Sequence, residues 1–382
     1  MKRLSQLAVK NKKVLVRVDL NVPLKNGKVQ DDFKIKASLP TINYLLKKKA
    51  KVILMTHLGR PIGRDPKLST QVLVAPLRRL LKRKVTFVAD CIGKKVVHKA
   101  EKLQPGQVLL LENLRFHAEE KNNSVKFAKQ LASVADVYVD DAFASMHNKH
   151  ASIVGVPRYL KNAIGLLAEK EITQLSKATT KPKRPYVAIM GGAKVKDKIK
   201  VIKALLKKVD MLLIGGAMMF TFLKAQGYEV GKSLVDKEGL PLAKKLLRNK
   251  KIVLPVDAIV AARVTQKGKV VAVDHIPKNM IGLDIGPKTV KLFKEKLKGA
   301  KTVVWNGPLG MYEKKQFAKG TKSIALALAK SKAVTIVGGG DSAHAVRTFK
   351  LAKKFTHVST GGGASLRFFE GTVLPGLKAL SQ

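Results

Sequence analysis

The stretch Val334-Thr-Ile-Val-Gly-Gly-Gly-Asp-Ser342 joins an apolar run directly to three glycines, an aspartate and a serine. A continuous apolar run of this length is typical of a strand buried on both faces of a parallel sheet. Glycines that follow a strand and open a helix let backbone N–H groups approach a bound anion. The stretch therefore predicts a strand, a tight turn and a helix, the repeating unit of an α/β fold.

The same unit recurs along the chain, because short runs rich in Val, Ile and Leu alternate with stretches of helical periodicity. The other runs predicted as strands are Val14–Val18, Lys51–Met55, Val108–Leu111, Asp136–Val139, Tyr186–Met190, Met211–Ile214, Ile252–Leu254, Thr302–Trp305 and His357–Ser359. The stretches predicted as helices are Ile164–Ala178, Lys198–Val209, Pro241–Asn249 and Gly320–Ser331. This alternation predicts two Rossmann-like lobes, each a mostly parallel sheet flanked by helices.

Length and composition agree with two lobes. The chain has 382 residues, of which 46% are hydrophobic, and no apolar run approaches the ~20 residues that a membrane helix needs. We expect an N-terminal lobe over 1–163, an interdomain helix and proline-broken linker over 164–185, and a second lobe over 186–367. The single cysteine, Cys91, is expected to be a packed thiol, and a cytoplasmic location follows by default.

The charge of the chain is unusual, since 75 Lys and Arg against 26 Asp and Glu give a net charge of +49. Such a surface attracts polyanions at low salt. The basic residues are spread along the whole chain, and aromatic residues, at 5%, form no stacking platform for single strands. We therefore favour a lysine-rich solvated surface over a specific nucleic-acid interface.

The residues that follow the predicted strands differ between the two halves. In the first half these residues include His57, Arg60 and Arg115, which suit a small anion carrying a carboxylate or phosphate. In the second half they are glycines that open helices, which suit nucleotide phosphates. Because open α/β sheets bind ligands at the carboxyl ends of their strands, we expect an acidic metabolite on one lobe and a nucleotide on the other.

Three other motifs are weak. Gly227–Ser233 has one residue too few between its glycines for a P-loop, and no buried strand precedes it. Gly338-x-Gly340-x-x-Ala343 lacks the acidic residue that NAD binding requires at the end of the next strand. His147-x-x-His150 has no cysteine nearby and lacks the i, i+4 spacing of helical metal ligands, so a role without metal is favoured.

Eight stretches, taken together and in order, resemble the phosphoglycerate kinase family. They are Val16–Pro23, Thr56–Pro61, Leu111–Phe116, Asp140–Phe143, Gly191–Lys198, Val304–Gly310, Val337–Ser342 and Ser359–Ser365. The resemblance covers nearly the whole chain. It implies a monomeric glycolytic kinase that exchanges a phosphoryl group between ATP and 3-phosphoglycerate with Mg²⁺. It also implies that the two lobes close over the ligands and that segment 368–382 returns to the first lobe.

The resemblance also implies roles for individual residues. The catalytic positions are Lys34, Lys194 and Gly362. The substrate-binding positions are Asp19, Asn21, His57, Arg60, Arg115, His147 and Asn148. The nucleotide-binding positions are Gly191, Ala193, Lys198, Gly215, Gly216, Ala217, Asn306, Pro308, Glu313, Gly339, Gly340 and Ser342, and Asp341 is the metal ligand.

The chain departs from the family at three positions. Lys34 and Asn148 occupy positions where the family has arginines, so a planar fork and a cation are missing. Arg367 replaces a family glutamate, which is expected to disturb the docking of the C-terminal segment. Two alternatives therefore remain beside an active kinase: a catalytically impaired homologue that binds nucleotide, and a polyanion-binding protein on a kinase scaffold.

Overall fold

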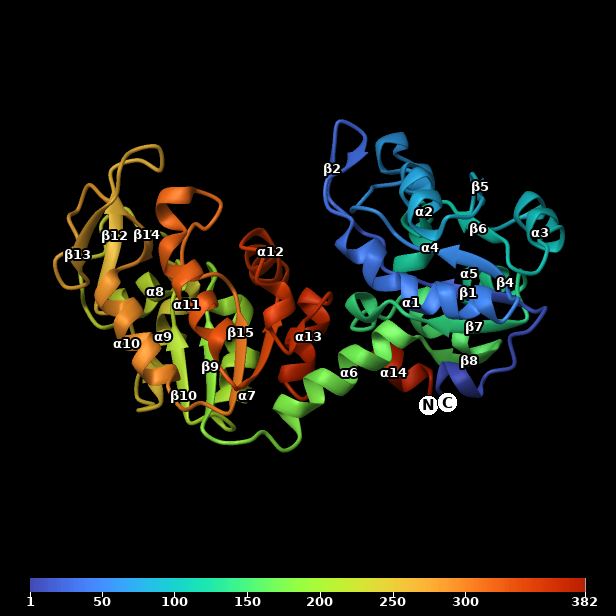
Figure 1. Cartoon of the computed structure of the whole chain (residues 1–382). Helices are drawn as coiled ribbons and strands as arrows, with labels where there is room; N and C mark the ends of the chain where they lie inside the picture. Colours follow the sequence, from blue (N-terminus) through green and yellow to red (C-terminus); the bar gives the residue numbers. More distant parts are fainter. Residues whose placement is uncertain (382) are drawn as a thin grey trace. The chain divides into compact units, whose positions relative to one another are not determined.

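The computed structural model describes residues 1–381, which form two compact units. Unit 1 contains Met1–Thr173 together with the C-terminal segment from Val373, and unit 2 contains Gln174–Thr372. None of the helices in the described residues is long and apolar enough to cross a membrane. Figure 1 shows the two units and their elements.

The centre of unit 1 is a six-stranded sheet in the order β5-β6-β4-β1-β7-β8, and every neighbouring pair is parallel. The strands are β1 (Lys13–Arg17), β4 (Lys51–Met55), β5 (Val85–Val88), β6 (Val108–Leu111), β7 (Val137–Asp140) and β8 (Lys161–Ile164). A short hairpin, β2 (Leu24–Lys25) and β3 (Lys28–Val29), follows β1. The parallel arrangement brings the carboxyl ends of all six strands to one edge of the sheet.

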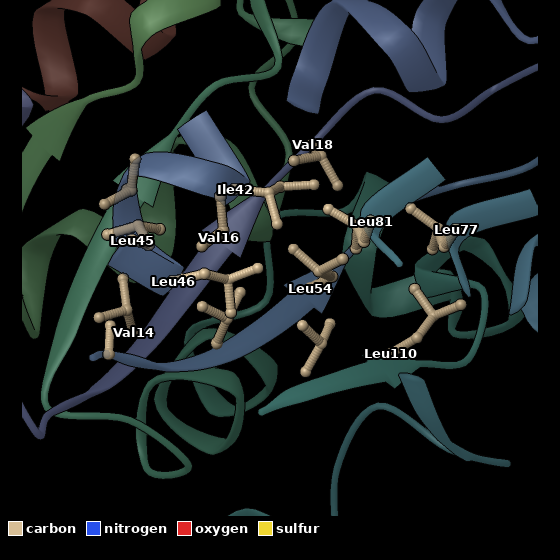
Figure 2. Close-up of a cluster of buried hydrophobic side chains, with 14 of the residues drawn as sticks. Val14, Val16, Val18, Ile42, Leu45, Leu46, Leu54, Leu77, Leu81 and Leu110 are labelled. Carbon is tan, nitrogen blue, oxygen red and sulfur yellow. The ribbon is translucent and has the colours of Figure 1, made fainter. Parts of the chain in front are cut away.

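Helices cover the sheet of unit 1 and build its core. They are α1 (Phe33–Lys47), α2 (Val74–Leu81), α3 (Lys94–Glu101), α4 (Ala118–Lys121), α5 (Val125–Ala132), α14 (Pro375–Ala379) and the first part of α6 (Leu166–Thr179), whose residues from Gln174 belong to unit 2. Figure 2 shows Ile42 and Leu45 of α1 packed with β-strand side chains such as Val16 and Leu54, all fully buried. Each such side chain contributes about 1.5–3 kcal/mol by leaving water, so this layer fixes α1 and its Lys34 against the sheet.

Unit 2 is built on a second six-stranded parallel sheet, in the order β11-β10-β9-β15-β16-β17. The strands are β9 (Tyr186–Met190), β10 (Met211–Ile214), β11 (Ile252–Val253), β15 (Thr302–Asn306), β16 (Val334–Gly338) and β17 (His357–Val358). In chain order within this sheet, that arrangement is the 3-2-1-4-5-6 order of dinucleotide-binding folds. The point where the order reverses lies between β9 and β15.

The remaining elements of unit 2 surround this sheet. The helices are α7 (Ile199–Leu206), α8 (Met218–Ala225), α9 (Leu240–Leu246), α10 (Pro287–Leu297), α11 (Lys319–Lys330), α12 (Gly340–Thr348) and α13 (Gly362–Phe369). A separate antiparallel sheet has the order β13 (Lys269–Ala272), β12 (Asp257–Ala261), β14 (Ile281–Ile285). The fold class predicted from the sequence, two α/β lobes with mostly parallel sheets, is confirmed.

Several boundaries differ from the prediction. Each run predicted as a strand is one, within a residue at either end, but β5, β8, the β2–β3 hairpin and the antiparallel sheet of unit 2 were missed. Ile164 ends β8, and the helix predicted to start there begins at Leu166. The division between the units falls inside α6, after Thr173, and the C-terminal return starts at Val373 rather than at position 368. In unit 1, α14 is held by a hydrogen bond from Gly376 N–H to the Met146 carbonyl, 2.9 Å long.

Candidate active site

Asp19 and Lys34 form the centre of a polar cluster at the carboxyl edge of the unit 1 sheet. Asp19 follows β1, Lys34 lies in the first turn of α1, and Lys34 Nζ is 2.7 Å from Asp19 Oδ2. Asp19 Oδ1 accepts a 3.0 Å hydrogen bond from Asn21 N–H. Burial alone would raise the pKa of Asp19, but nearby positive charge, led by Lys34, together with the hydrogen bonds from Lys34 and from Asn21 N–H outweighs burial and lowers that pKa to about 2. Asp19 is therefore a fixed anion that orients Lys34.

His57 follows β4 in the same cluster and is almost fully buried. Its Nδ1 lies 3.0 Å from an NH2 nitrogen of Arg17, the last residue of β1. Because a guanidinium can only donate, Nδ1 accepts and the ring proton is on Nε2. Burial and the charge of Arg17 lower the pKa of His57 well below its usual range. His57 is thus a neutral hydrogen-bond donor through Nε2, not a cation.

Arg17 is itself fixed by a buried network. Its Nε donates to Ser152 Oγ over 3.0 Å, and its NH1 donates to the Val18 carbonyl over 2.6 Å. Ser152 in turn donates from Oγ and from its backbone N–H to the two carboxylate oxygens of Glu120, over 2.6 and 2.9 Å. The buried Glu120 carboxylate, reached through Ser152, compensates the positive charge of the Arg17 guanidinium. Arg17 can therefore fix the tautomer of His57 without being an uncompensated buried charge.

Arg115 brings a second guanidinium to this edge. Its NH1 donates to the Gly59 carbonyl over 2.7 Å, and the Asn113 side chain accepts from its backbone N–H. Burial, Arg17 and Arg60 all lower the pKa of Arg115. Among the described residues, Arg115 Nε is buried and has no hydrogen-bond partner. An unpaired donor between like charges is a place where an anion is stabilising.

The other predicted substrate residues lie near this edge with different exposure. Arg60 is exposed, whereas Asn21 is partly buried and accepts from Gly59 N–H over 2.9 Å through its Oδ1. His147 and Asn148 are partly buried in the turn after β7, and the backbone N–H of Asn148 bonds the Ser145 carbonyl. Asn148 supplies no charge, and its neighbour Lys149 is exposed.

In unit 2 the loops after β9 and β15 are bonded to each other at the point where the strand order reverses. Gly191 N–H donates to the Asn306 carbonyl over 2.9 Å, and Gly192 N–H donates to the Pro308 carbonyl over 3.0 Å. A Cβ atom on Gly191 would lie 2.0 Å from the Pro308 oxygen, so only glycine permits this approach. Open α/β sheets bind nucleotides at such a reversal.

Lys198 lies across these two loops. Its Nζ donates to the Gly191 carbonyl over 2.7 Å, and Cβ atoms built on Gly192 and Gly307 would come within 3 Å of it. Burial lowers the pKa of Lys198 to about 8, although Asp341 works in the opposite direction. The Lys198 ammonium is poorly hydrated, which disfavours its charged form. Phosphates bound nearby would raise its pKa again.

The start of α12 completes this edge of unit 2. Gly339 has φ +92°, and a Cβ there would lie 2.8 Å from Asn306 Nδ2, which in the described chain is buried without a partner. Ser342 Oγ accepts from Gly307 N–H over 3.0 Å, which ties α12 to the β15 loop. Gly340 opens the helix, where a built Cβ would meet no atom within 4 Å, and Asp341 next to it is exposed. The helix start thus offers N–H groups and a carboxylate.

The remaining predicted residues of unit 2 take these places. Lys194 and Ala193 are exposed in the loop after β9, and Glu313 is exposed after the β15 loop. Gly215, Gly216 and Ala217 lead from β10 into α8, where Gly216 N–H bonds the Leu309 carbonyl over 3.0 Å. Gly362 opens α13 with its built Cβ 3.2 Å from Gly340 N. Arg367 in the last turn of α13 pairs with Glu370, which caps that helix, 3.1 Å apart.

Sequence reasoning assigned no role to Arg17, Ser152, Glu120 or Asn113. One signal was available for Arg17, because it is the only charged residue in the apolar run Val14–Val18. A charge in a strand buried on both faces requires a buried partner. The partners Ser152 and Glu120 lie more than a hundred positions away, so spacing could not identify them.

The two half-sites define the class of this protein. Unit 1 has a cationic cluster with an unpaired buried donor, and unit 2 has a glycine-lined edge of the kind that binds nucleotides, with a buried lysine and an exposed carboxylate. An α/β protein with this pair of sites is a kinase of a small acidic metabolite. The family model for phosphoglycerate kinase matches residues 4–372, and the chain belongs to the phosphoglycerate kinase family.

Individual relatives agree with this assignment. The phosphoglycerate kinase of Moorella thermoacetica is 53% identical over 99% of this chain and 98% of its own length. That of Dictyoglomus turgidum is 51% identical over 97% of this chain and 96% of its own length. Among solved structures, the enzyme of Pyrococcus horikoshii superposes with a TM-score of 0.91 at 35% identity, and that of Coxiella burnetii with 0.87 at 40%. Each covers all of this chain and is itself covered to 98%.

Proposed function

We propose that this chain catalyses the reversible transfer of a phosphoryl group between 1,3-bisphosphoglycerate and ADP, giving 3-phosphoglycerate and ATP in glycolysis. The observation that carries the proposal is the buried, unpaired Nε of Arg115 beside neutral His57 and the cations Arg17 and Arg60. This arrangement is complementary to a small molecule with a carboxylate and a phosphate, and it leaves a donor that such a ligand satisfies.

In unit 1 each predicted residue has a distinct proposed part. Arg60 and Arg115 neutralise the substrate anions, and His57 donates a hydrogen bond from Nε2. Asp19 keeps Lys34 in place through the 2.7 Å ion pair, so the ammonium faces the position where charge develops during transfer. Asn21, His147 and Asn148 add polar contacts at the rim. No strong base is needed, since the carboxylate of 3-phosphoglycerate is already a nucleophile.

In unit 2 we assign proposed roles to the residues of the loops after β9, β10 and β15 and to those at the start of α12. Lys198 and the N–H groups at the start of α12 hold nucleotide phosphates, with Gly339, Gly340 and Ser342 at the helix start. Gly191, Ala193, Gly215, Gly216 and Ala217 line the base, and Asn306, Pro308 and Glu313 lie toward the ribose. Lys194 follows the transferred group, and Gly362 supports the phosphates from the start of α13. Transfer of this kind depends on positioning and charge stabilisation more than on covalent chemistry.

Mg²⁺ fits the donor set of unit 2. Asp341 presents an exposed carboxylate at the start of α12, close enough to Lys198 to raise the pKa of that lysine. Mg²⁺ prefers one or two carboxylates together with substrate phosphates, so Asp341 is the proposed protein ligand. When bound with nucleotide, the ion supplies positive charge that offsets the phosphates.

Three further properties are part of the proposal. We propose a cytoplasmic location, because the single cysteine, Cys91, is buried and forms no disulfide in the described structure, and a monomer, because the family resemblance implies one. It binds polyanions without specificity at low salt, because its net charge is +49. Neither an impaired homologue nor a polyanion-binding scaffold is preferred, since the Lys34–Asp19 pair retains a cation at the family arginine position.

A coupled assay tests the proposal. The full chain is supplied with ATP, Mg²⁺ and 3-phosphoglycerate, and formation of 1,3-bisphosphoglycerate is followed at low and at physiological salt. Turnover that requires Mg²⁺ and is lost in Lys194→Ala supports the kinase. Folded protein that binds ADP but shows no turnover would instead make the impaired homologue the better account, with Lys34 and Asn148 as the cause.

A further inference from the structure

Three side chains that bind soft and borderline metal ions meet in unit 1, outside the residues proposed for phosphoryl transfer. They are Asp90 and Cys91, which follow β5, and His117, which precedes α4. One ligand atom from each, a carboxylate oxygen, a sulfur and an imidazole nitrogen, lie within 4.8 Å of one another. Cys91 is the only cysteine of the chain.

The geometry points to a binding site for Zn²⁺ formed by Asp90 Oδ1, Cys91 Sγ and His117 Nε2. Zn²⁺ takes sulfur, nitrogen and oxygen ligands at about 2.0–2.3 Å in a tetrahedron, which separates neighbouring ligand atoms by about 3.3–3.8 Å. The Asp90–His117 distance of 2.8 Å must open slightly and the longer separations must close slightly. Side-chain rotations suffice, because Asp90 and His117 are 42% and 25% exposed.

The three side chains are already oriented by neighbouring groups. Asp90 Oδ1 accepts a 2.6 Å hydrogen bond from Cys91 N–H and lies 2.8 Å from His117 Nε2. The ring of His117 packs on Phe127, with centroids 5.0 Å apart, and Cys91 Sγ is directed to the Glu112 carbonyl at 2.9 Å. Of these contacts, the Cys91 N–H bond and the Phe127 packing remain on metal binding and fix Asp90 and His117 beforehand, which raises metal affinity. The Asp90–His117 bond and the Cys91 S–H bond to the Glu112 carbonyl are exchanged for bonds to the metal.

Burial leaves one coordination position open to solvent. Cys91 is fully buried, whereas the other two side chains reach the surface. An ion that arrives from solvent therefore contacts the Asp90 carboxylate and the His117 imidazole before it reaches the buried Cys91 sulfur. Water is the fourth ligand. Three protein ligands plus water is a common zinc arrangement.

The local charge favours a cation even though the chain is strongly basic. Three carboxylates, those of Asp90, Glu112 and Glu120, lie near enough to Cys91 to act on its charge, and Arg64 acts against them. These carboxylates favour a cation beside the sulfur. Metal binding releases the proton of the Cys91 thiol to solvent as the Zn–S bond forms. The ring proton of His117 moves from Nε2 to Nδ1, so that Nε2 can bind the metal.

Cobalt substitution tests the site in the full chain. Co²⁺ replaces Zn²⁺ with the same ligands, and a thiolate ligand gives it a sulfur-to-metal charge-transfer band in the near ultraviolet. Mg²⁺ in large excess keeps oxygen-only sites, such as Asp341, occupied. We expect one Co²⁺ per chain with this band, displaced by Zn²⁺, and no band in Cys91→Ala.

Because substitution of the buried Cys91 can affect folding, two variants of exposed ligands and one matched control test the site without changing the thiol. Asp90→Asn and His117→Gln should each weaken Co²⁺ binding at least ten-fold while the melting temperature stays near that of the parent. His275→Gln is the control, because His275 and Asp274 form an exposed pair 2.7 Å apart with no thiol. An absent band in the parent chain, or equal affinity in the parent and in His117→Gln, would overturn the site.

Discussion

Lys34 occupies a position where the resemblance to the family implies an arginine. Its single ammonium contact to Asp19 replaces an arginine fork, and one charge-assisted hydrogen bond contributes about 1.5–3 kcal/mol. We predict that Lys34→Arg raises kcat/KM for 3-phosphoglycerate by about ten-fold and that Lys34→Ala lowers it by about 10². Steady-state kinetics at fixed ATP measures both.

Lys36→Arg provides the matched control for this change. Lys36 lies one half-turn further along α1, pairs with Asp32 at 2.8 Å and is 58% exposed. Its replacement should leave kcat/KM unchanged. If Lys34→Arg behaves in the same way, the position needs only a positive charge and the fork of the family arginine has no separate contribution.

Lys198 connects pH to nucleotide affinity. Burial lowers its pKa to about 8, so the ammonium is charged at pH 7 and neutral at pH 9. If the charge holds phosphates, the affinity for ADP falls as pH rises through about 8, and binding near that pH takes up a proton. Calorimetry in two buffers of different ionisation enthalpy measures the proton uptake.

Two variants separate Lys198 from the general basicity of the chain. Lys198→Arg remains charged at pH 9, so its ADP affinity should no longer fall between pH 7 and 9. Lys200→Ala removes an exposed lysine two positions away and should reproduce the parent profile. A parent profile that is flat to pH 9.5 would exclude Lys198 as the titrating group.

At the scale of elements, the sequence predicted most of the buried parallel strands and missed β5, β8 and the antiparallel sheet, although β12 and β14 of that sheet are largely buried. β9 and β16 are uninterrupted apolar runs, because both faces of their sheet are covered. β13 has no such pattern, since three of its four residues are exposed and its apolar side chains have no core to face. Strand β8 was hidden for a related reason, as it starts with exposed Lys161 and its last residue was absorbed into the predicted α6.

The candidate site was predictable in its position and not in its contacts. Glycines, histidines and arginines after strands indicate the edge where ligands bind, because parallel strands end on one side. The pairing of Arg17 with His57, which fixes the His57 tautomer, joins residues forty positions apart. Likewise the bond from Gly192 N–H to the Pro308 carbonyl forms only once β9 and β15 are neighbours.

The start of α6 provides a stability prediction at this scale. Asp141 is fully buried, and its Oδ1 accepts from Leu167 N–H and Ala168 N–H over 2.9 and 3.2 Å. Burial raises its pKa to about 8. Between pH 4 and pH 8 the folded protein keeps the Asp141 proton, whereas the unfolded chain has lost it. The free energy of unfolding therefore decreases as pH rises from about 4 through 8.

Asp141→Asn removes this ionisation and keeps an oxygen for the two N–H groups. We predict that it raises the melting temperature at pH 9 relative to the parent and changes it much less at pH 4. Asp136→Asn, which alters an exposed carboxylate of the same unit, should not change the slope with pH. Parallel melting curves for parent and Asp141→Asn across this range would contradict the assignment.

The hydrogen-bonded loops after β9 and β15 provide a second prediction at this scale, on stability and nucleotide affinity. A Cβ on Gly191 meets the Pro308 oxygen at 2.0 Å, so Gly191→Ala must separate the β9 and β15 loops. Forced separation in packed structure costs about 1–3 kcal/mol, and nucleotide affinity should decrease with it. Denaturant unfolding measures the first effect. Gly340→Ala is the control for stability, because no atom lies within 4 Å of its built Cβ.

At the scale of the whole molecule, a net charge of +49 makes like-charge repulsion a general destabilising term. Screening shortens the reach of this repulsion from roughly 30 Å at 0.01 M to roughly 10 Å at 0.1 M salt. We predict that the melting temperature rises over this interval in NaCl, in contrast to proteins near neutrality. A decrease with salt would mean that ion pairs such as Lys34–Asp19 outweigh the repulsion.

The same field acts on the substrates, which are anions. A positive molecule raises the encounter rate with 3-phosphoglycerate and nucleotide at low salt, and screening removes this gain. We therefore expect kcat/KM for both substrates to decrease with salt while kcat changes little, because steering acts before the chemical step. Substituting exposed lysines far from the site, such as Lys244 and Lys245 of α9, by glutamine should reduce the slope of that decrease. An unchanged slope in such variants would assign the salt effect to the local cations of the half-sites, Arg60, Arg115 and Lys198, rather than to the charge of the whole molecule.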